Sequence, residues 1–205
     1  MAFFFDQSRC VSCKVCAVGC KDWNQVNPGP VRWRNAKTYE TNTAPHFFPL
    51  SMSCNHCEEP ACATACGAGA IIKRQIDGLV YVDRDKCIGL QSCISSCPFA
   101  EPKIADDFQE PVAYVGWQIR HPMQKCFFCM EKLDGGNGDR PVCVDSCPTF
   151  ALDFGDFNTL KSKYPDAVQL NPADFPYAYI NNTTDTGPSL LIRKRGMLTY
   201  TEDID

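Results

Sequence analysis

Cys10-Val11-Ser12-Cys13-Lys14-Val15-Cys16-Ala17-Val18-Gly19-Cys20, near the start of the chain, holds four cysteines separated by gaps of two, two and three residues. In this pattern three thiolates can hold one iron–sulfur cluster, and the fourth can reach towards a second cluster. The stretch therefore predicts a protein that binds more than one iron–sulfur cluster.

Runs of the same kind recur along the first three-quarters of the chain, which has fifteen cysteines among 205 residues. The later runs are Cys54, Cys57, Cys62 and Cys66, then Cys87, Cys93 and Cys97, then Cys126, Cys129, Cys143 and Cys147. The third run is incomplete, because Leu90 stands where the spacing asks for its second cysteine. One of four predicted cluster sites is therefore short of a ligand.

Disulfides and zinc are the alternative uses of so many cysteines. An odd count argues against a closed disulfide framework, and gaps of two residues are too short for ordinary disulfide geometry. Paired C-x-x-C motifs also build zinc ribbons, but zinc sites rarely take a third and a fourth cysteine from one tight run. A zinc-binding structural module stays open as an alternative, and it predicts a colourless protein.

Length and charge limit the other functions. The formal net charge is −4, and cluster-bound thiolates make the loaded protein more acidic, so nucleic acid is not an expected partner. Residues 1–6 lack a basic region or a twin arginine, and we expect neither a signal peptide nor a membrane span. No nucleophile–base, dinucleotide, flavin or pterin motif occurs, which indicates that the chain is not an enzyme by itself.

The coarse pattern predicts an α+β fold. Residues 75–83 join an Asp-Gly turn to alternating apolar residues and predict a hairpin, residues 151–154 predict a strand, and residues 158–164 predict a brief helix. The long spacers 21–53 and 101–125 predict loops with short strands that wrap the clusters. The remainder after residue 164 predicts an extended tail.

A hairpin beside each cysteine run resembles a small ferredoxin module, so we expect two pseudosymmetric ferredoxin-like modules, each of the bacterial two-cluster type. The outer module would take residues 1–52 and 108–157, the inner module residues 53–107, and a partner-binding tail residues 158–205. Lysines near the runs, among them Lys86 and Lys125, can offset cluster charge, and most are expected at the surface. His56 lies between two ligands but lacks a Rieske partner motif, which favours a hydrogen-bonding or surface role.

In two-cluster ferredoxins the fourth cysteine of each run binds the other cluster, and this analogy assigns four ligand sets. Ligand set 1 is Cys10, Cys13, Cys16 and Cys147; set 2 is Cys54, Cys57, Cys62 and Cys97; set 3 is Cys66, Cys87 and Cys93; set 4 is Cys20, Cys126, Cys129 and Cys143. Leucine offers no donor. We therefore expect three [4Fe-4S] clusters and one [3Fe-4S] cluster at set 3, against a four-iron cluster capped by water or another ligand, and against an empty site.

These motifs carry a family resemblance over roughly residues 3–160. The four cysteine runs, Ser53-Cys54-Asn55-His56-Cys57-Glu58-Glu59-Pro60-Ala61-Cys62, the segment from Asp77 to Cys87, and Val142-Cys143-Val144-Asp145-Ser146-Cys147-Pro148 resemble the beta subunits of DMSO-reductase-type complex iron–sulfur molybdoenzymes. Leu90 departs from polysulfide- and DMSO-reductase-like subunits, which generally keep cysteine there. Subunits that resemble the beta subunits of nitrate reductase carry tryptophan at that position and hold a three-iron cluster.

The resemblance implies an electron-transfer subunit of anaerobic respiration. It would relay electrons through four clusters between a large catalytic subunit, with a molybdenum or tungsten bis-pterin, and a membrane anchor that exchanges them with quinone. An alternative is a non-respiratory relative, similar to transhydroxylase or a soluble formate dehydrogenase. We expect a peripheral membrane complex on the extracytoplasmic face, co-exported with a partner that bears a twin-arginine signal; a cytoplasmic complex is the alternative.

Overall fold

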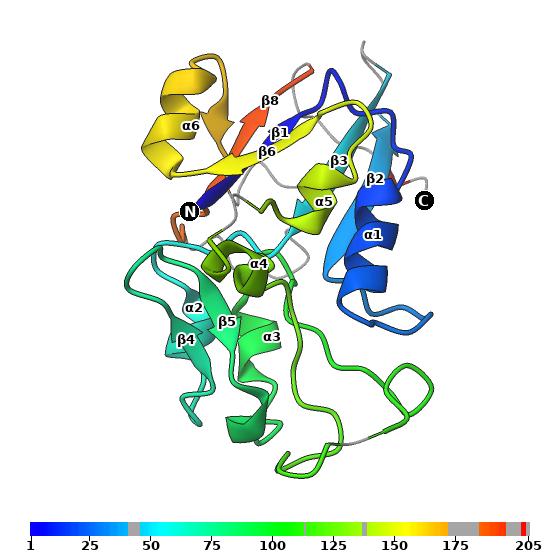
Figure 1. The fold of residues 1–205 in the computed structure, drawn as a ribbon, viewed down its shortest axis with the longest axis vertical. Helices are drawn as coiled ribbons and strands as arrows, with labels where there is room; N and C mark the ends of the chain where they lie inside the picture. The colour runs from blue at the N-terminus through cyan, green and yellow to red at the C-terminus, as the bar shows by residue number, and fades with distance from the viewer. Residues whose placement is uncertain (41–45, 113, 137–138, 172–184, 196–201, 204–205) are drawn as a thin grey trace.

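The computed structural model describes residues 1–40, 46–112, 114–136, 139–171, 185–195 and 202–203 (Figure 1). Its elements are short and alternate between helix and strand. In chain order they are β1 Ala2–Asp6, α1 Val15–Trp23, β2 Arg34–Glu40, β3 Phe47–Ser53, α2 Ala61–Thr64, β4 Ile71–Lys73, β5 Val80–Val82, η1 Arg84–Lys86, α3 Ser92–Ser96, α4 Met130–Asp134, α5 Val142–Asp145, β6 Leu152–Gly155, α6 Phe157–Lys163, β7 Val168–Gln169, β8 Leu190–Arg193 and β9 Glu202–Asp203.

Sheet A has the strand order β6-β1-β8-β7 and is built around a strand that is buried at every residue. β1 runs antiparallel to β6 and parallel to β8. Because side chains alternate across a strand, Phe3 and Phe5 face the main core, and Phe4 stacks on Tyr164 beyond α6 with ring centroids 3.6 Å apart. Both faces of the sheet are therefore covered, and this explains the apolar run at the start of the chain.

Four of the helices form two packed pairs, which mark two regions in opposite halves of Figure 1. The sheet region contains sheet A with α1 packed against α5, and the hairpin region contains the β4–β5 pair with α2 packed against α3. The antiparallel β4–β5 pair confirms the hairpin predicted at residues 75–83, and β6 and α6 confirm the strand and helix predicted after Cys147. Each region combines two packed helices with an antiparallel strand pair.

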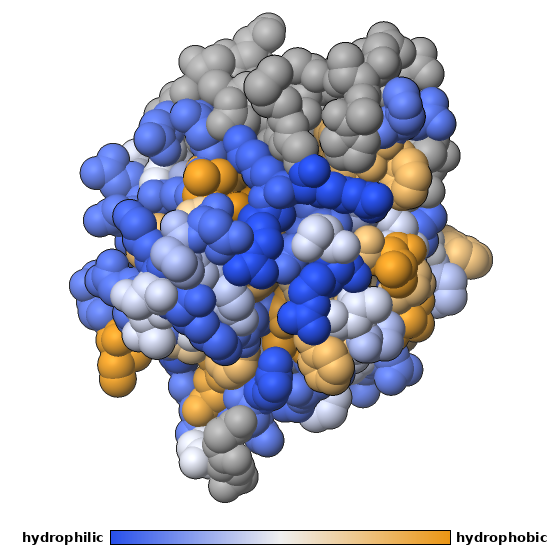
Figure 2. Space-filling view, turned by 90° about the horizontal axis from the view of Figure 1, so that it is seen from above, coloured by the Kyte–Doolittle hydropathy of each residue, from blue (hydrophilic) through white to orange (hydrophobic). Residues whose placement is uncertain are grey.

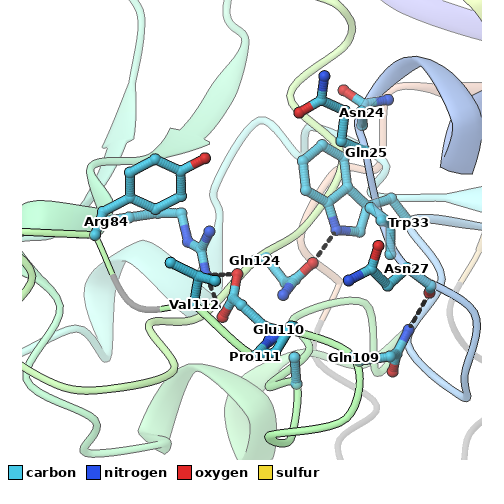
Figure 3. Close-up of a pocket in the computed structure, with 13 residues that line it drawn as sticks. Asn24, Gln25, Asn27, Trp33, Arg84, Gln109, Glu110, Pro111, Val112 and Gln124 are labelled. Atoms are coloured by element: carbon cyan, nitrogen blue, oxygen red, sulfur yellow. Dashed lines mark hydrogen bonds and ion pairs between the residues drawn. The ribbon is translucent and has the colours of Figure 1, made fainter.

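The two long spacers differ from each other. β2 and β3 pair antiparallel at seven positions, which is a longer strand pair than the short strands predicted in the first spacer. The described residues of the second spacer, 101–112 and 114–125, have no helix and form the isolated bridge between Lys103 and Gln124 in place of the short strands predicted there. Side chains fasten this second spacer: Trp33 Nε1 donates to Gln124 Oε1 at 2.8 Å and Gln109 Nε2 donates to the Asn27 carbonyl at 2.9 Å, around a cavity of about 310 Å3 (Figure 3).

The C-terminal segment differs from the predicted extended tail. Leu190, Leu191 and Ile192 are buried because β8 inserts between β1 and β7 in sheet A. Just before β8, Thr186 and Gly187 accept backbone hydrogen bonds from Glu59 and Glu58 beside the second cysteine run. The described part of the segment is therefore integral to the fold; residues 172–184, 196–201 and 204–205 of the predicted tail lie outside the described residues.

The surface over the α6 and β8 end is mainly hydrophilic, and apolar side chains there form scattered patches (Figure 2). In the part of the chain that the structure covers, none of the helices has the length and apolar character needed to cross a membrane.

Candidate iron–sulfur centres

The fifteen cysteines occupy the loops and helix ends where each region packs together. All are free thiols; eleven are buried, and among the four others Cys13 is exposed at the surface. The second members of the paired motifs precede or cap short helices, while Cys16, Cys20, Cys62, Cys93 and Cys143 lie inside helices. The α1–α5 and α2–α3 contacts therefore bring cysteines from runs far apart in sequence into the same two regions.

The sheet region contains the thiols of sets 1 and 4. Burial, together with the neighbouring Cys16, Cys147 and Cys13, raises the pKa of Cys10 to about 11. Burial likewise raises the pKa of Cys20 to about 12, together with Cys143 and Cys129. Cys126 has its pKa raised by burial and then by Cys20 and Cys143. Cysteines from the first and last runs therefore lie near enough to influence one another's pKa, Cys10 with Cys16 and Cys147, and Cys20 with Cys129 and Cys143.

The hairpin region contains the thiols of sets 2 and 3. Burial raises the pKa of Cys57 to about 12, with added contributions from Cys54 and Cys97. Burial also raises the pKa of Cys62 to about 12, with Cys54 and Cys57 next. The pKa of Cys93 is raised by burial and by Cys66 and Cys87. Cysteines of the second and third runs therefore lie near one another.

The loops that carry these thiols repeat one unusual backbone feature. The residue just before the second position of each paired motif has a positive φ: Ser12 at 54°, His56 at 44°, Gly89 at 77° and Phe128 at 67°. Side chains other than glycine rarely adopt this conformation, which costs of the order of 1–3 kcal/mol. Such a kink turns successive backbone N–H groups towards one point, a concavity typical of iron–sulfur and phosphate sites.

Leu90 lies in a loop that keeps this backbone shape. Gly89, immediately before it, occupies the left-handed position that Ser12, His56 and Phe128 occupy in the complete motifs. Leu90 lines a small cavity of about 20 Å3 together with Cys66, Cys87 and Cys93, and it is 62% exposed. The binding loop is therefore retained at set 3, and only the donor atom is missing.

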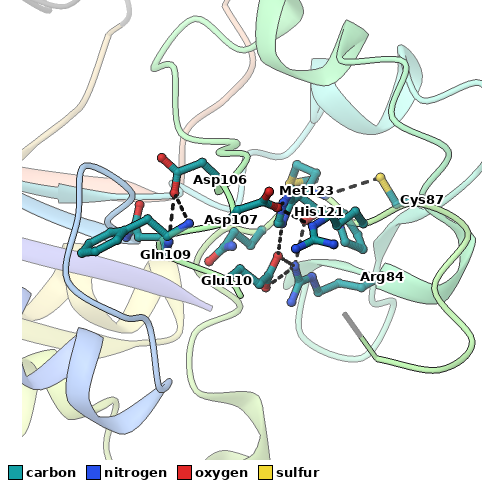
Figure 4. A network of polar contacts seen from close by, with 12 residues as sticks. Arg84, Cys87, Asp106, Asp107, Gln109, Glu110, His121 and Met123 are labelled. Carbon is teal, nitrogen blue, oxygen red and sulfur yellow. Dashed lines mark hydrogen bonds and ion pairs between the residues drawn. The ribbon is translucent and has the colours of Figure 1, made fainter. Parts of the chain in front are cut away.

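A polar network supports set 3 from the long spacer (Figure 4). The Met123 backbone N–H donates to Cys87 Sγ at 3.4 Å. Glu110 accepts from Arg84 at 2.7 Å, and His121 lies 3.4 Å from Glu110 and 2.8 Å from Asp107. The spacer predicted to wrap the clusters thus provides a hydrogen bond to one of the thiols.

Other donors reach the remaining sets. Thr186 Oγ1 donates to Cys57 Sγ at 3.1 Å, the Ala151 N–H donates to Cys147 Sγ at 3.3 Å, and Asn24 Nδ2 donates to Cys20 Sγ at 3.6 Å. Burial acts to raise the pKa of Cys147, but hydrogen bonds outweigh it and leave the pKa below its ordinary value. Hydrogen bonds to thiolate sulfur are one of the means by which a protein sets the potential of a cluster.

Two buried cations lie among the thiols. Arg34 is 2% exposed and is held by Ser51 Oγ at 3.2 Å and Ser53 Oγ at 2.9 Å, yet its buried Nε has no partner. Its pKa is raised because the thiols around it, Cys143 first, outweigh its burial. Lys125 is 1% exposed and donates to Cys54 Sγ at 3.5 Å. A buried cation without an anionic neighbour is costly, so this environment fits anionic clusters.

The spacing of the thiols also bears on which metal they suit. Among the residues that the structure describes, no three His, Cys, Asp or Glu side chains form a group that would hold a metal ion. The cysteines nevertheless influence one another's pKa within both regions, and a wider spacing of this kind suits ligands that surround a multi-iron cluster, since such a cluster is wider than one ion. The donor set therefore fits iron–sulfur clusters better than zinc.

Comparison with known proteins agrees with this chemistry. A family model described as a 4Fe-4S dicluster domain matches residues 45–157. One of the chains of anaerobic dimethyl sulfoxide reductase from Escherichia coli (strain K12) is 37% identical over 201 residues, which cover 93% of this chain and 87% of that protein. This protein belongs to the family of electron-transfer iron–sulfur subunits of molybdoenzyme complexes.

Further relatives are named for other sulfur compounds. A sulfite dehydrogenase subunit of Allochromatium vinosum is 32% identical, and the match covers 82% of this chain and 74% of the relative. The thiosulfate reductase electron transfer subunit PhsB of Salmonella typhi is 35% identical, with 73% and 72% covered. The family resemblance inferred from the cysteine runs is therefore confirmed, and so is the conclusion that the subunit transfers electrons within a larger oxidoreductase.

Sequence reasoning did not find the buried cations. Lys125 differs from the prediction that most lysines near the runs lie at the surface, and Arg34 had no motif around it. Nothing in the residues beside Lys125 signals its burial, because Lys86 occupies the same place before Cys87 and is exposed. His56 does form the predicted hydrogen bond, since its Nδ1 accepts from the Val80 N–H at 3.0 Å.

Proposed function

We propose that the subunit relays single electrons through three [4Fe-4S] clusters and one [3Fe-4S] cluster. Sets 1, 2 and 4 would each hold a four-iron cluster through four thiolates, and set 3 would hold the three-iron cluster through Cys66, Cys87 and Cys93. When bound, the clusters supply reversible one-electron transfer. The chain itself supplies the thiolates, the hydrogen bonds to sulfur and the exclusion of water.

The observation that carries the proposal is the order of the four sets. Three electrostatic influences between sets support a single file: Cys16 of set 1 raises the pKa of Cys143 of set 4, Cys54 of set 2 raises that of Cys126 of set 4, and Cys93 of set 3 raises that of Cys62 of set 2, each less than burial does. We infer the order set 1, set 4, set 2 and set 3. Such a file is what a relay between two partners needs.

The three-iron assignment rests on the loop around Leu90. Its backbone matches the complete motifs, so the binding cradle is present, but leucine offers no electron pair to a fourth iron. Leu90 Cδ1 lies 3.4 Å from where a side chain at Gly67 would begin, which places the leucine across from the Cys66 loop. A three-iron cluster there would differ in potential from its neighbours.

The two ends of the file are the sites proposed for the partners. Near set 1, Val11 and Val18 are 66% and 64% exposed, and near set 3, Ile88 and Leu90 are 44% and 62% exposed. Exposed apolar side chains beside a terminal cluster fit docking surfaces. We assign these ends to a large catalytic subunit with a molybdenum or tungsten bis-pterin and to a quinone-reactive membrane anchor.

The modular division also belongs to this proposal. An outer ferredoxin-like module of residues 1–52 and 108–157 would hold sets 1 and 4, and an inner module of residues 53–107 would hold sets 2 and 3. The α1–α5 and α2–α3 pairs support this division. Residues 158–205, beyond the part inserted in sheet A, would contact a partner. The assembly would be a peripheral membrane complex on the extracytoplasmic face, after co-export with a twin-arginine-targeted partner.

Low-temperature EPR, with iron measured on the same anaerobic sample, tests the proposal. We expect about 15 irons per chain, an oxidised-state signal from a three-iron cluster, and signals from interacting four-iron clusters after dithionite. Iron at about 16 per chain with no oxidised-state signal would contradict the role of Leu90. A colourless protein with zinc in place of iron would contradict the relay itself.

A further inference from the structure

Lys125 occupies the junction between two of the proposed cluster sites. Its Nζ donates to Cys54 Sγ of set 2 at 3.5 Å and to the carbonyl of Cys126, a set 4 residue, at 2.9 Å. A third hydrogen bond reaches the Val80 carbonyl on β5. An ammonium group has three donors, so all three are used and the position of the charge is fixed.

The charge on Lys125 is not paired with a carboxylate. In the described part of the chain, the lysine and arginine side chains that are buried are Lys125 and Arg34, and neither forms an ion pair with a carboxylate within 4 Å. Buried Glu101 lies near enough for both cations to lower its pKa, but burial raises that pKa to about 7. A buried ammonium with no counter-charge is strongly unfavourable. Thiolate and cluster charge on both sides of Lys125 offsets this cost, and the cation in turn stabilises negative charge there.

Lys86 provides the matched contrast. Both lysines come directly before the first cysteine of a run, Lys86 before Cys87 and Lys125 before Cys126. The side chain of Lys86 is 57% exposed and pairs with Asp83 at 2.8 Å, so solvent and a carboxylate neutralise its field. The same residue type at the same motif position is therefore directed inward at one run and outward at the other.

We propose that Lys125 is a positioning residue for electron transfer, whose fixed buried charge raises the reduction potentials of the clusters at sets 2 and 4. This inference rests on the proposed relay. Adding an electron to a cluster makes it more negative, and an adjacent cation stabilises that state more than the oxidised state. Sets 4 and 2 lie in the middle of the inferred order. By raising both of their reduction potentials, Lys125 would keep the potential difference small for electron transfer from one region to the other.

The test is a redox titration, followed by EPR, of the full chain loaded with its clusters. In Lys125→Met and Lys125→Gln we expect two of the four-iron signals to fall in potential by at least a tenfold change in the reduction equilibrium, which is about 59 mV for one electron. The reduction potential of the three-iron cluster should not change. Lys125→Arg should keep the potentials of the unmodified chain, and Lys86→Met should change none of them.

Each outcome separates this inference from the relay on which it rests. Full iron content with unchanged potentials in both neutral variants would overturn the role of Lys125 and leave the relay intact. Iron loss in both neutral variants would also overturn it, because Lys125 would then be needed for assembly and not for potential. Absence of cluster signals from the unmodified chain would instead remove the proposed function.

Discussion

The sheet region and the hairpin region both bring cysteines together, but they differ in the strands, thiols and buried cations around those cysteines. The sheet region has the four-stranded sheet A, and Arg34, on the strand β2 that packs against α1, lies among thiols of sets 1 and 4. The hairpin region has a two-stranded sheet, and its set 3 has three thiols, an exposed Leu90 and no buried cation among the described residues. Loops with the same backbone kink therefore lie in different electrostatic surroundings.

Ligand count and buried charge are therefore separate properties of these sites. The backbone kink recurs at all four runs, so the loops themselves do not distinguish the sites. What differs is whether a fourth thiol is present and whether a cation lies beside the sulfur atoms. Adding a thiol in one region, or removing a buried cation from the other, should make the cysteine sites of the two regions more alike.

The largest change is expected from giving the hairpin region the missing ligand. Leu90→Cys should convert the proposed three-iron cluster to a four-iron cluster, because the loop already has the shape found in the complete motifs. We expect about one more iron per chain and loss of the oxidised-state EPR signal. Iron analysis and EPR of the anaerobic protein measure both.

Leu90→Ala is the control for that change, because it alters the packing without adding a donor. It should keep the three-iron signal and the iron content. If the oxidised-state signal vanishes in Leu90→Ala as well, leucine packing and not the absence of a thiol determines the cluster type.

The reverse change removes the buried cation, Arg34, from beside the thiols of sets 1 and 4. Arg34→Met should destabilise the fold by about 3–5 kcal/mol, because it removes the counter-charge to buried thiolates and leaves Ser51 and Ser53 without their donor. Denaturant unfolding of the loaded chain, followed by visible absorbance, measures the effect. Arg32→Met is the matched control, since Arg32 lies two residues away on the surface and its loss should have little effect.

The sequence predicts the features that follow from local patterns and does not predict those that depend on contacts between distant segments. Spacing alone predicts the four runs, the shortfall at Leu90, the β4–β5 hairpin and the strand after Cys147, because cysteine spacing and apolar alternation are local patterns. The burial of Arg34 and Lys125 and the insertion of β8 beside β1 depend on contacts between distant segments. The positive φ of Ser12 and Phe128 was equally hidden, since those residue types do not favour it.

A smaller effect is expected at the contact between β1 and β8 in sheet A. Arg193 on β8 donates to Asp6 on β1 at 2.7 Å. Burial acts to raise the pKa of Asp6, but hydrogen bonds from Ser8 and Arg193 outweigh it and lower the pKa. The carboxylate therefore stabilises the fold at neutral pH, and this contribution is lost only as the pH falls through the lowered pKa.

Asp6→Asn should accordingly cost about 1.5–3 kcal/mol at neutral pH, the usual value of a hydrogen bond to a charged group. Hydrogen exchange at β8 should rise, whereas exchange in the β4–β5 pair should not, because that pair belongs to the hairpin region. Equal increases in both regions would show that the two regions unfold as one unit and would remove the distinction drawn between them.

The smallest effect is expected at a single hydrogen bond to sulfur. Thr186 is 2% exposed and its Oγ1 donates to Cys57 Sγ at 3.1 Å. Thr186→Val keeps the shape and removes the donor, so the potential of the set 2 cluster should fall by a few tens of mV, less than the roughly 59 mV of a tenfold change.

Thr149→Val provides the counterpart in the sheet region, where the hydroxyl lies 3.7 Å from Cys147 Sγ. The longer contact is weaker, so its loss should change the set 1 potential less than Thr186→Val changes that of set 2. If the two shifts are equal, the distance to sulfur does not govern the size of the effect. Sheet-region and hairpin-region clusters would then respond alike to a lost donor, and ligand count and buried charge alone would account for the difference between them.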